Sequence, residues 1–85
     1  MSKEEDFKAA QELVKTLTKR PSNDQLLELY SLFKQASVGD VQGKRPGMLD
    51  IKGRAKFDAW AGRKGTSKQA AMDAYVALVD RLVGS

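Results

Sequence analysis

Two short stretches of the chain combine aromatic rings with lysines at helical spacing. In the first, the residues at i, i+3 and i+4 are Tyr30, Phe33 and Lys34. In the second, the residues at i, i+4 and i+8 are Lys52, Lys56 and Trp60. On a helix each set shares one face, and rings beside ammonium groups suit a ligand that is part flat ring and part phosphate. The same spacing is typical of an ordinary amphipathic helix with lysines at its rim, and spacing alone favours that structural interpretation.

The residue types that carry most enzyme chemistry are absent. The chain has no histidine and no cysteine, which removes the commonest general base, the soft metal ligands and the thiolate nucleophile. It contains neither a phosphate-binding loop nor a nucleophile elbow. We therefore expect a binding module that is not an enzyme, with no metal and no cofactor.

Net charge restricts the partner without naming it. The 85 residues are enough for one domain, 1–85, and carry a formal charge of +4. This balance indicates an anionic partner, so nucleic acid, an anionic membrane surface and a phosphorylated small molecule all stay open. The charged start, Met1 to Asp6, lacks the apolar segment of a secretory signal, and no apolar run approaches the ~20 residues that cross a bilayer. We expect a cytoplasmic protein with no stable membrane insertion.

Capping signals divide the chain into four helices that must position these residues. The capping-box pattern, Ser or Thr followed three residues later by Glu or Gln, occurs at Ser2, Ser22 and Thr66. Asp50 can cap a further helix. Apolar residues at helical spacing follow each of these positions, and no alternating strand pattern is present. The predicted fold class is all-α.

Proline and glycine predict where these helices end. The first should fade before Pro21, and the second, which has an unusually wide apolar stripe, should stop at Gly39. A polar, glycine-bearing loop over 38–49 then leads to a third helix over about 51–63. The wide stripe leaves part of the second helix free to face a partner helix or a ligand.

Several long, ungapped blocks of the chain form a specific pattern. They include Lys34-Gln35-Ala36, Val38-Gly39-Asp40, Arg45-Pro46-Gly47-Met48-Leu49-Asp50, Asp58-Ala59-Trp60 and Lys64-Gly65-Thr66-Ser67-Lys68. In these blocks, and over about residues 7–82, the chain resembles the acyl-CoA-binding protein family. The resemblance implies a four-helix bundle of up-down-down-up order with a long loop between helices 2 and 3. It also implies non-covalent binding of medium- to long-chain acyl-CoA esters by an intracellular carrier and pool former.

The resemblance further implies which residues hold the ligand. For the CoA portion, the matching positions are Lys15, Tyr30, Phe33, Lys34, Lys52, Lys56 and Tyr75. For the acyl-chain groove, they are Phe7, Ala10, Leu26 and Leu27. Phosphates need cations or amide donors, and the acyl chain needs an apolar groove. From the residues alone, a solvated rim for the lysines and plain core packing for the apolar positions remain alternatives.

The chain departs from the family pattern at a few of these positions. Phe33 stands where tyrosine is usual, which removes a hydroxyl that could reach a phosphate, while Phe57 replaces a usual tryptophan and Leu26 a usual methionine. An alternative function is a small basic helical module that binds nucleic acid or an anionic membrane surface. The cations are spread over several expected helices and mixed with acids, which argues against nucleic acid. We expect long-chain acyl-CoA as the partner, no nucleic acid and a monomer.

Overall fold

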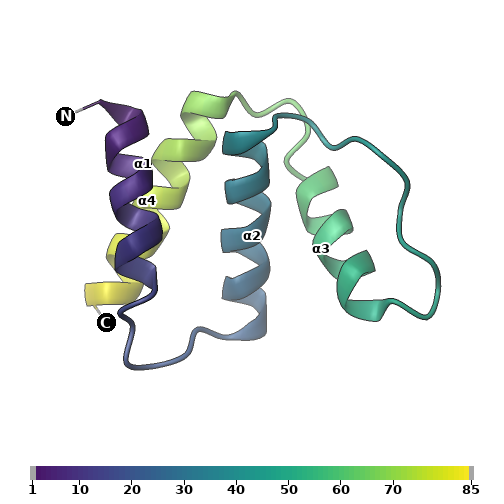
Figure 1. The fold of residues 1–85 in the computed structure, drawn as a ribbon, viewed down its shortest axis with the longest axis horizontal. Helices are drawn as coiled ribbons and strands as arrows, with labels where there is room; N and C mark the ends of the chain where they lie inside the picture. The colour runs from purple at the N-terminus through teal and green to yellow at the C-terminus, as the bar shows by residue number, and fades with distance from the viewer. Residues whose placement is uncertain (1, 85) are drawn as a thin grey trace.

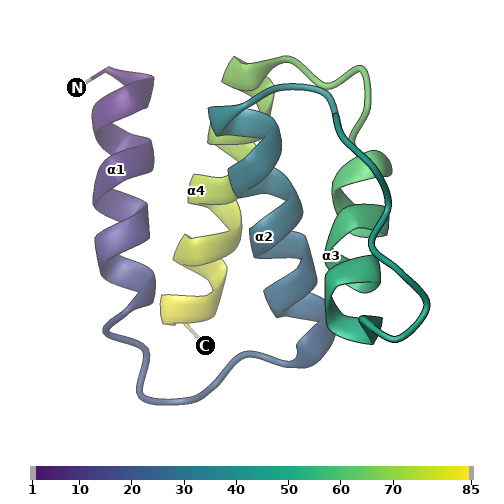
Figure 2. The ribbon, with the colours of Figure 1, turned by 45° about the vertical axis from the view of Figure 1, so that its right-hand side comes forward.

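Four α-helices make up the computed structural model, which describes residues 2–84 (Figure 1). They are α1 (Lys3–Val14), α2 (Asn23–Ser37), α3 (Ile51–Ala61) and α4 (Lys68–Gly84). The chain runs one way along α1 and α4 and the other way along α2 and α3 (Figures 1 and 2). The predicted all-α bundle of up-down-down-up order, with its long loop before α3, is therefore confirmed.

Two predicted caps fix the starts of α2 and α3. The Ser22 hydroxyl accepts from the Gln25 N–H at 3.1 Å, and the Gln25 side chain accepts from the Ser22 N–H at 2.9 Å, which is the reciprocal capping box. The Asp50 carboxylate accepts from the Gly53 N–H at 2.9 Å. These bonds satisfy amide donors that would otherwise lack partners in the first turn. The local sequence alone was enough to predict them.

The start of α4 differs from the prediction by one residue. The Ser67 hydroxyl, rather than that of Thr66, accepts from the first turn, at 3.0 Å from the Ala70 nitrogen. The Thr66 carbonyl instead accepts from the Gln35 side chain at 2.7 Å. The expected cap at Thr66 is therefore wrong, because a tertiary hydrogen bond fixes this residue in the turn that precedes the helix.

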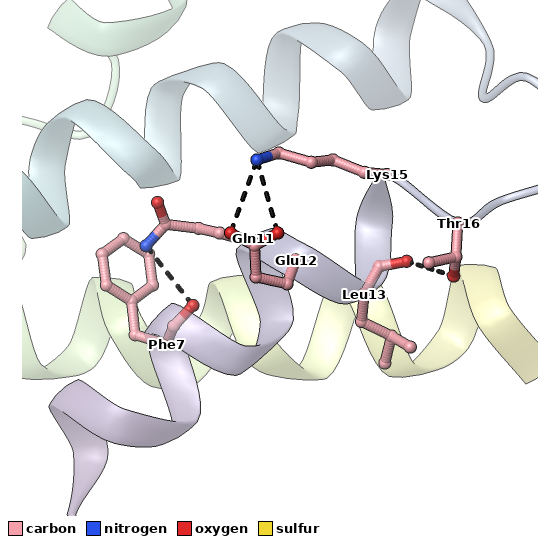
Figure 3. Close-up of polar contacts among 6 residues, drawn as sticks. All are labelled: Phe7, Gln11, Glu12, Leu13, Lys15 and Thr16. Carbon is pink, nitrogen blue, oxygen red and sulfur yellow. Dashed lines mark hydrogen bonds and ion pairs between the residues drawn. The ribbon is translucent and has the colours of Figure 1, made fainter.

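The end of α1 comes several residues before Pro21. The Lys15 and Thr16 N–H groups bond carbonyls three residues back, at 3.2 and 3.0 Å, and the Thr16 hydroxyl also donates to the Leu13 carbonyl at 2.7 Å in this final turn (Figure 3). At the end of α2, Gly39 adopts a φ of +100°, a value that favours glycine, and its N–H bonds the Gln35 carbonyl at 3.1 Å. The predicted stop at Gly39 is thus confirmed.

The core lies among α1, α2 and α4. Its buried residues are Phe7, Ala10, Leu29, Leu32, Ala36, Ala71, Tyr75, Leu78 and Val79. Each large apolar side chain buried in this way contributes about 1.5–3 kcal/mol. From α3, Trp60 is buried, and it packs on the other side of α2. One side of α2 therefore serves the core and another serves α3, as the wide stripe predicted.

Polar bonds hold α3 and its flanking loops on the bundle. The Trp60 indole donates to the Gly39 carbonyl at 2.8 Å. The fully buried Gln35 side chain donates to the Thr66 carbonyl and, at 2.9 Å, to the Asp40 carboxylate. These bonds join the end of α2, the loop after it and the turn after α3. None of the described helices is long and apolar enough to cross a membrane.

Candidate functional site

A groove of about 460 Å³ lies between α2 and the first turns of α3. Its lining combines apolar side chains with cations and a ring: Arg20, Asn23, Leu26, Leu27, Tyr30, Ile51, Lys52, Ala55 and Lys56. This volume lies in the range of roughly 300–1,000 Å³ that small-molecule sites occupy. The arrangement can hold an apolar chain against the leucines while an anionic group meets the lysines.

Two lysines at the α2–α3 contact lie over aromatic rings of the facing helix. The Lys56 ammonium is 5.4 Å from the centre of the Tyr30 ring, and the Lys34 ammonium is 4.9 Å from the centre of the Trp60 ring. Sequence spacing had placed each lysine beside the aromatic residue of its own segment. The structure shows that each lysine also lies over a ring of the other helix. Each contact is worth about 0.5–1 kcal/mol at an exposed site. Within residues 2–84 neither ammonium group is paired with a carboxylate, so both charges are available to a ligand.

The groove brings together part of the predicted site. The predicted residues that line it are Leu26, Leu27, Tyr30, Lys52 and Lys56. Lys34 lies on the same helix pair, one turn beyond Tyr30, against Trp60. The apolar part and the cationic part of the predicted site thus lie next to each other at the α2–α3 contact.

Other predicted residues lie in the core instead. Phe7, Ala10 and Tyr75 are 7%, 4% and 5% exposed, and the Phe7 ring meets the Tyr75 ring edge-on at 5.1 Å between centres. Burial raises the pKa of the Tyr75 hydroxyl. Phe7 and Ala10 thus belong to the buried core, against which Leu26 also packs, and they do not line the groove.

Lys15 and Phe33 lie at the surface outside the groove. Lys15 follows the last turn of α1, where its ammonium lies 3.5 Å from the Glu12 carboxylate (Figure 3). Such an exposed pair contributes little to stability. The Phe33 side chain is 36% exposed, and its ring centre is 6.1 Å from that of Phe7. Both remain reachable by a ligand that extends beyond the groove.

Sequence reasoning missed part of the groove wall: Arg20, Asn23, Ile51 and Ala55. The signal for Ile51 and Ala55 was present, because they precede Lys52 and Lys56 by one position each and share the i, i+4 spacing. Arg20 and Asn23 flank the Pro21–Ser22 link before α2, and the Arg20 guanidinium donates to the Asn23 side chain at 3.5 Å. No pattern in the sequence assigns them to a site.

A second hollow of similar volume lies elsewhere on the molecule. It is formed by the loop over 16–21 with Gln25 and the end of α4. None of the predicted ligand residues lines it. The groove between α2 and α3, where those residues gather, is therefore the candidate site.

Fold and groove together define a class: a small all-α binding protein with an apolar groove and a cationic rim. The family model described as "Acyl CoA binding protein" matches residues 4–79. The chain belongs to the acyl-CoA-binding protein family.

Relatives and a solved structure agree with this assignment. The chain is 57% identical over 79 residues to the Acyl-CoA-binding protein homolog of Drosophila melanogaster, a match that covers 93% of this chain and 92% of the relative. It is 52% identical over 86 residues to the Acyl-CoA-binding protein homolog of Manduca sexta, covering 100% and 96%. The crystal structure of Oryza sativa Acyl-CoA-Binding Protein 2 superposes with a TM-score of 0.92 at 43% identity, covering 96% of this chain and 89% of that one.

Proposed function

We propose that this protein binds medium- to long-chain acyl-CoA esters non-covalently and acts as their carrier and pool former in the cytoplasm. The observation that carries the proposal is the α2–α3 groove, in which Leu26 and Leu27 lie beside Lys52 and Lys56. An acyl-CoA has the matching halves: an apolar chain and a polyanionic nucleotide. Family membership favours this ligand over a module whose main role is to bind nucleic acid or a membrane surface.

The proposed contacts follow the chemistry of each side chain. The ammonium groups of Lys34, Lys52 and Lys56 meet the phosphates, because a charge-assisted hydrogen bond is about twice as strong as a neutral one. The Tyr30 ring offers a platform for the adenine. Leu26 and Leu27 shield the start of the acyl chain from water.

The predicted residues outside the groove receive weaker roles in the proposal. Exposed Lys15 and partly exposed Phe33 reach the outer part of the CoA portion. Phe7, Ala10 and Tyr75 act mainly by packing the core against which α2 is positioned. We further propose a monomer, a single binding domain over 1–85, and binding without catalysis; Met1 and Ser85 lie outside the described residues.

A calorimetric series of ligands tests the proposal. Affinity should rise from free CoA through octanoyl- and dodecanoyl- to palmitoyl-CoA, since each buried methylene is worth up to about 0.8 kcal/mol. It should level off where the groove ends. Palmitate alone should bind poorly because it brings no phosphates to the lysines. A flat series, or palmitate that binds as tightly as palmitoyl-CoA, would rule the mechanism out.

A parallel titration separates the alternative function. A short DNA duplex at the same fixed salt concentration should bind far more weakly than palmitoyl-CoA, because phosphates alone satisfy only the lysines. Tighter binding of the duplex would reverse the assignment.

A further inference from the structure

The turn that leads into α3 exposes a cluster of large apolar side chains. Met48, Leu49 and Ile51 are 79%, 99% and 77% exposed, and the next most exposed large apolar residue in the described chain, Val83, reaches 44%. Single exposed apolar residues are ordinary, but a contiguous group marks an interaction surface. We call Met48, Leu49 and Ile51 the apolar tip. Figure 2 shows this turn at the foot of α3, on the side of the molecule away from α1.

The apolar tip is held in place by the backbone. The Asp50 N–H donates to the Gly47 carbonyl at 3.0 Å, so Met48 and Leu49 are the central residues of a closed turn. Such positions usually hold Gly, Pro, Asn, Asp or Ser. The Asp50 carboxylate also caps α3 at Gly53. Two large apolar side chains are thus presented to solvent on a preformed turn and are not folded back onto the protein.

The segment of the chain that carries the apolar tip is rich in cations. Residues 44–56 contain five cations and one acid, and the other residues contain ten of each. The cations of this segment are Lys44, Arg45, Lys52, Arg54 and Lys56. Arg45 is paired with Asp58 at 2.7 Å, while the three lysines make no ion pair within residues 2–84. The most exposed apolar side chains therefore belong to a stretch of the sequence with a net positive charge.

We propose that the apolar tip and its cations dock the protein reversibly on an anionic phospholipid bilayer. A bilayer surface offers negative headgroups to Lys44 and Lys52 and, just beneath them, an apolar medium for Leu49. A second copy of this chain would bring the same positive segment against itself. Nucleic acid would leave the apolar side chains in water. Docking of this kind is peripheral and needs no membrane-spanning helix.

Docking would also orient the ligand site. Ile51 belongs both to the apolar tip and to the groove wall, beside Lys52. Seating the tip on a bilayer therefore brings the mouth of the groove to the surface at which an acyl chain enters or leaves the lipid phase. This transfer step rests on the proposed function, whereas docking itself does not involve the ligand.

A vesicle flotation assay on the ligand-free protein tests the docking. Neutral phosphatidylcholine vesicles are compared with vesicles that contain about 30% phosphatidylserine, at low and at high salt. The variant is the double change Met48→Asp and Leu49→Asp, which leaves the groove wall intact. The control is Val83→Asp, which places one added acid at an exposed apolar position on α4.

The proposal expects selective and salt-sensitive binding. The unmodified protein should float with anionic vesicles at least about fivefold more than with neutral ones, and high salt should weaken that binding. The double variant should lose at least about tenfold, while Val83→Asp should stay within about twofold. Equal flotation with both vesicle types, or a double variant that still binds, would overturn the proposal. The proposal would also be overturned if the unmodified protein formed a dimer and the double variant a monomer, because the apolar tip would then be a self-association surface.

Two measurements keep docking separate from ligand binding. Palmitoyl-CoA affinity of the double variant in vesicle-free solution should equal that of the unmodified protein. A loss there would assign the apolar tip to the ligand site and overturn the docking proposal. The rate at which palmitoyl-CoA is taken up from anionic vesicles should fall at least about fivefold in the variant, and an unchanged rate would overturn the transfer step.

Discussion

The two sides of α2 are built on different principles. Toward α1 and α4, α2 packs apolar side chains such as Leu32 and Ala36 into the buried core. Toward α3, the contact consists of one buried indole, two lysines over aromatic rings, and hydrogen bonds from polar side chains. The difference teaches that the buried core and the proposed ligand groove lie on separate faces of one helix. A change on one side should leave the property of the other side largely intact.

The largest expected effect is the loss of a core ring. Phe7→Ala should lower the free energy of unfolding by about 3–5 kcal/mol, because it removes a ring packed against Tyr75 and leaves a cavity. Urea denaturation followed by circular dichroism measures the change. Lys56→Ala is the control and should shift the same quantity by no more than about 1 kcal/mol, the value of its contact with the Tyr30 ring.

The same variant tests how sharply the two faces are separated. At a temperature at which Phe7→Ala remains folded, its affinity for palmitoyl-CoA should be nearly unchanged. A large loss of affinity in the folded variant would mean that Phe7 contacts the acyl chain, as the family resemblance implied, and that the two faces are not independent.

Next in size is the loss of a groove cation. Lys34→Ala and Lys56→Ala should each weaken palmitoyl-CoA binding by about 1.5–3 kcal/mol, roughly ten- to a hundredfold, if each ammonium makes a charge-assisted bond to phosphate. Calorimetry measures the affinity. Exposed Lys8, on α1, is the matched control, and Lys8→Ala should bind as the unmodified protein does. Unchanged affinity in both Lys34→Ala and Lys56→Ala would contradict the assignment of the site.

Local features of the fold could be predicted from the sequence because they depend on neighbouring residues. The capping box at Ser22, the cap at Asp50 and the stop at Gly39 each involve groups within a few positions. Thr66 failed as a cap because Gln35, which is distant in sequence, bonds its carbonyl. The up-down-down-up order came from the family resemblance, whereas the loop over 38–49 followed from its glycines and proline.

The candidate site was predictable only as two half-sites. Spacing placed Tyr30 and Lys34 on one helix face and Lys52 and Lys56 on another. It could not show that Lys56 lies over the Tyr30 ring, because that contact depends on how α2 and α3 pack. Nor could periodicity separate core from groove positions, since both are apolar.

A smaller gain should come from restoring a hydroxyl at the edge of the site. Phe33→Tyr should tighten binding of both free CoA and palmitoyl-CoA by about 0.5–1.5 kcal/mol, the net value of one hydrogen bond. The ring is 36% exposed, so the fold can accept a polar atom there. Phe57→Tyr on α3 is the control, since this residue does not line the groove. A loss of affinity on calorimetry would mean that the added hydroxyl is buried without a partner.

The smallest expected effect is a difference in acid sensitivity between the two faces. The Gly65 N–H and the Gln35 amide hold the pKa of Asp40 below its ordinary value. The Arg45 guanidinium does the same for the pKa of Asp58, at 2.7 Å. Both carboxylates fasten loops that flank α3.

The sign of this effect follows from the direction of the shifts. A carboxylate whose pKa is lowered by folding stabilises the fold at pH values above its unfolded pKa, about 3.9, and loses that contribution as the pH falls through the folded value. The α3 side should therefore loosen first below about pH 4. Fluorescence of Trp60, the single tryptophan, reports that side, and circular dichroism reports all four helices. The fluorescence transition should begin at higher pH than the loss of helix, and Asp40→Asn with Asp58→Asn should shift the α3 transition most. Because exposed ion pairs are screened by solvent, the difference in pH between the two transitions should be small. Coincident transitions in the unmodified protein would show that α3 is as firmly bound to α2 as α4 is.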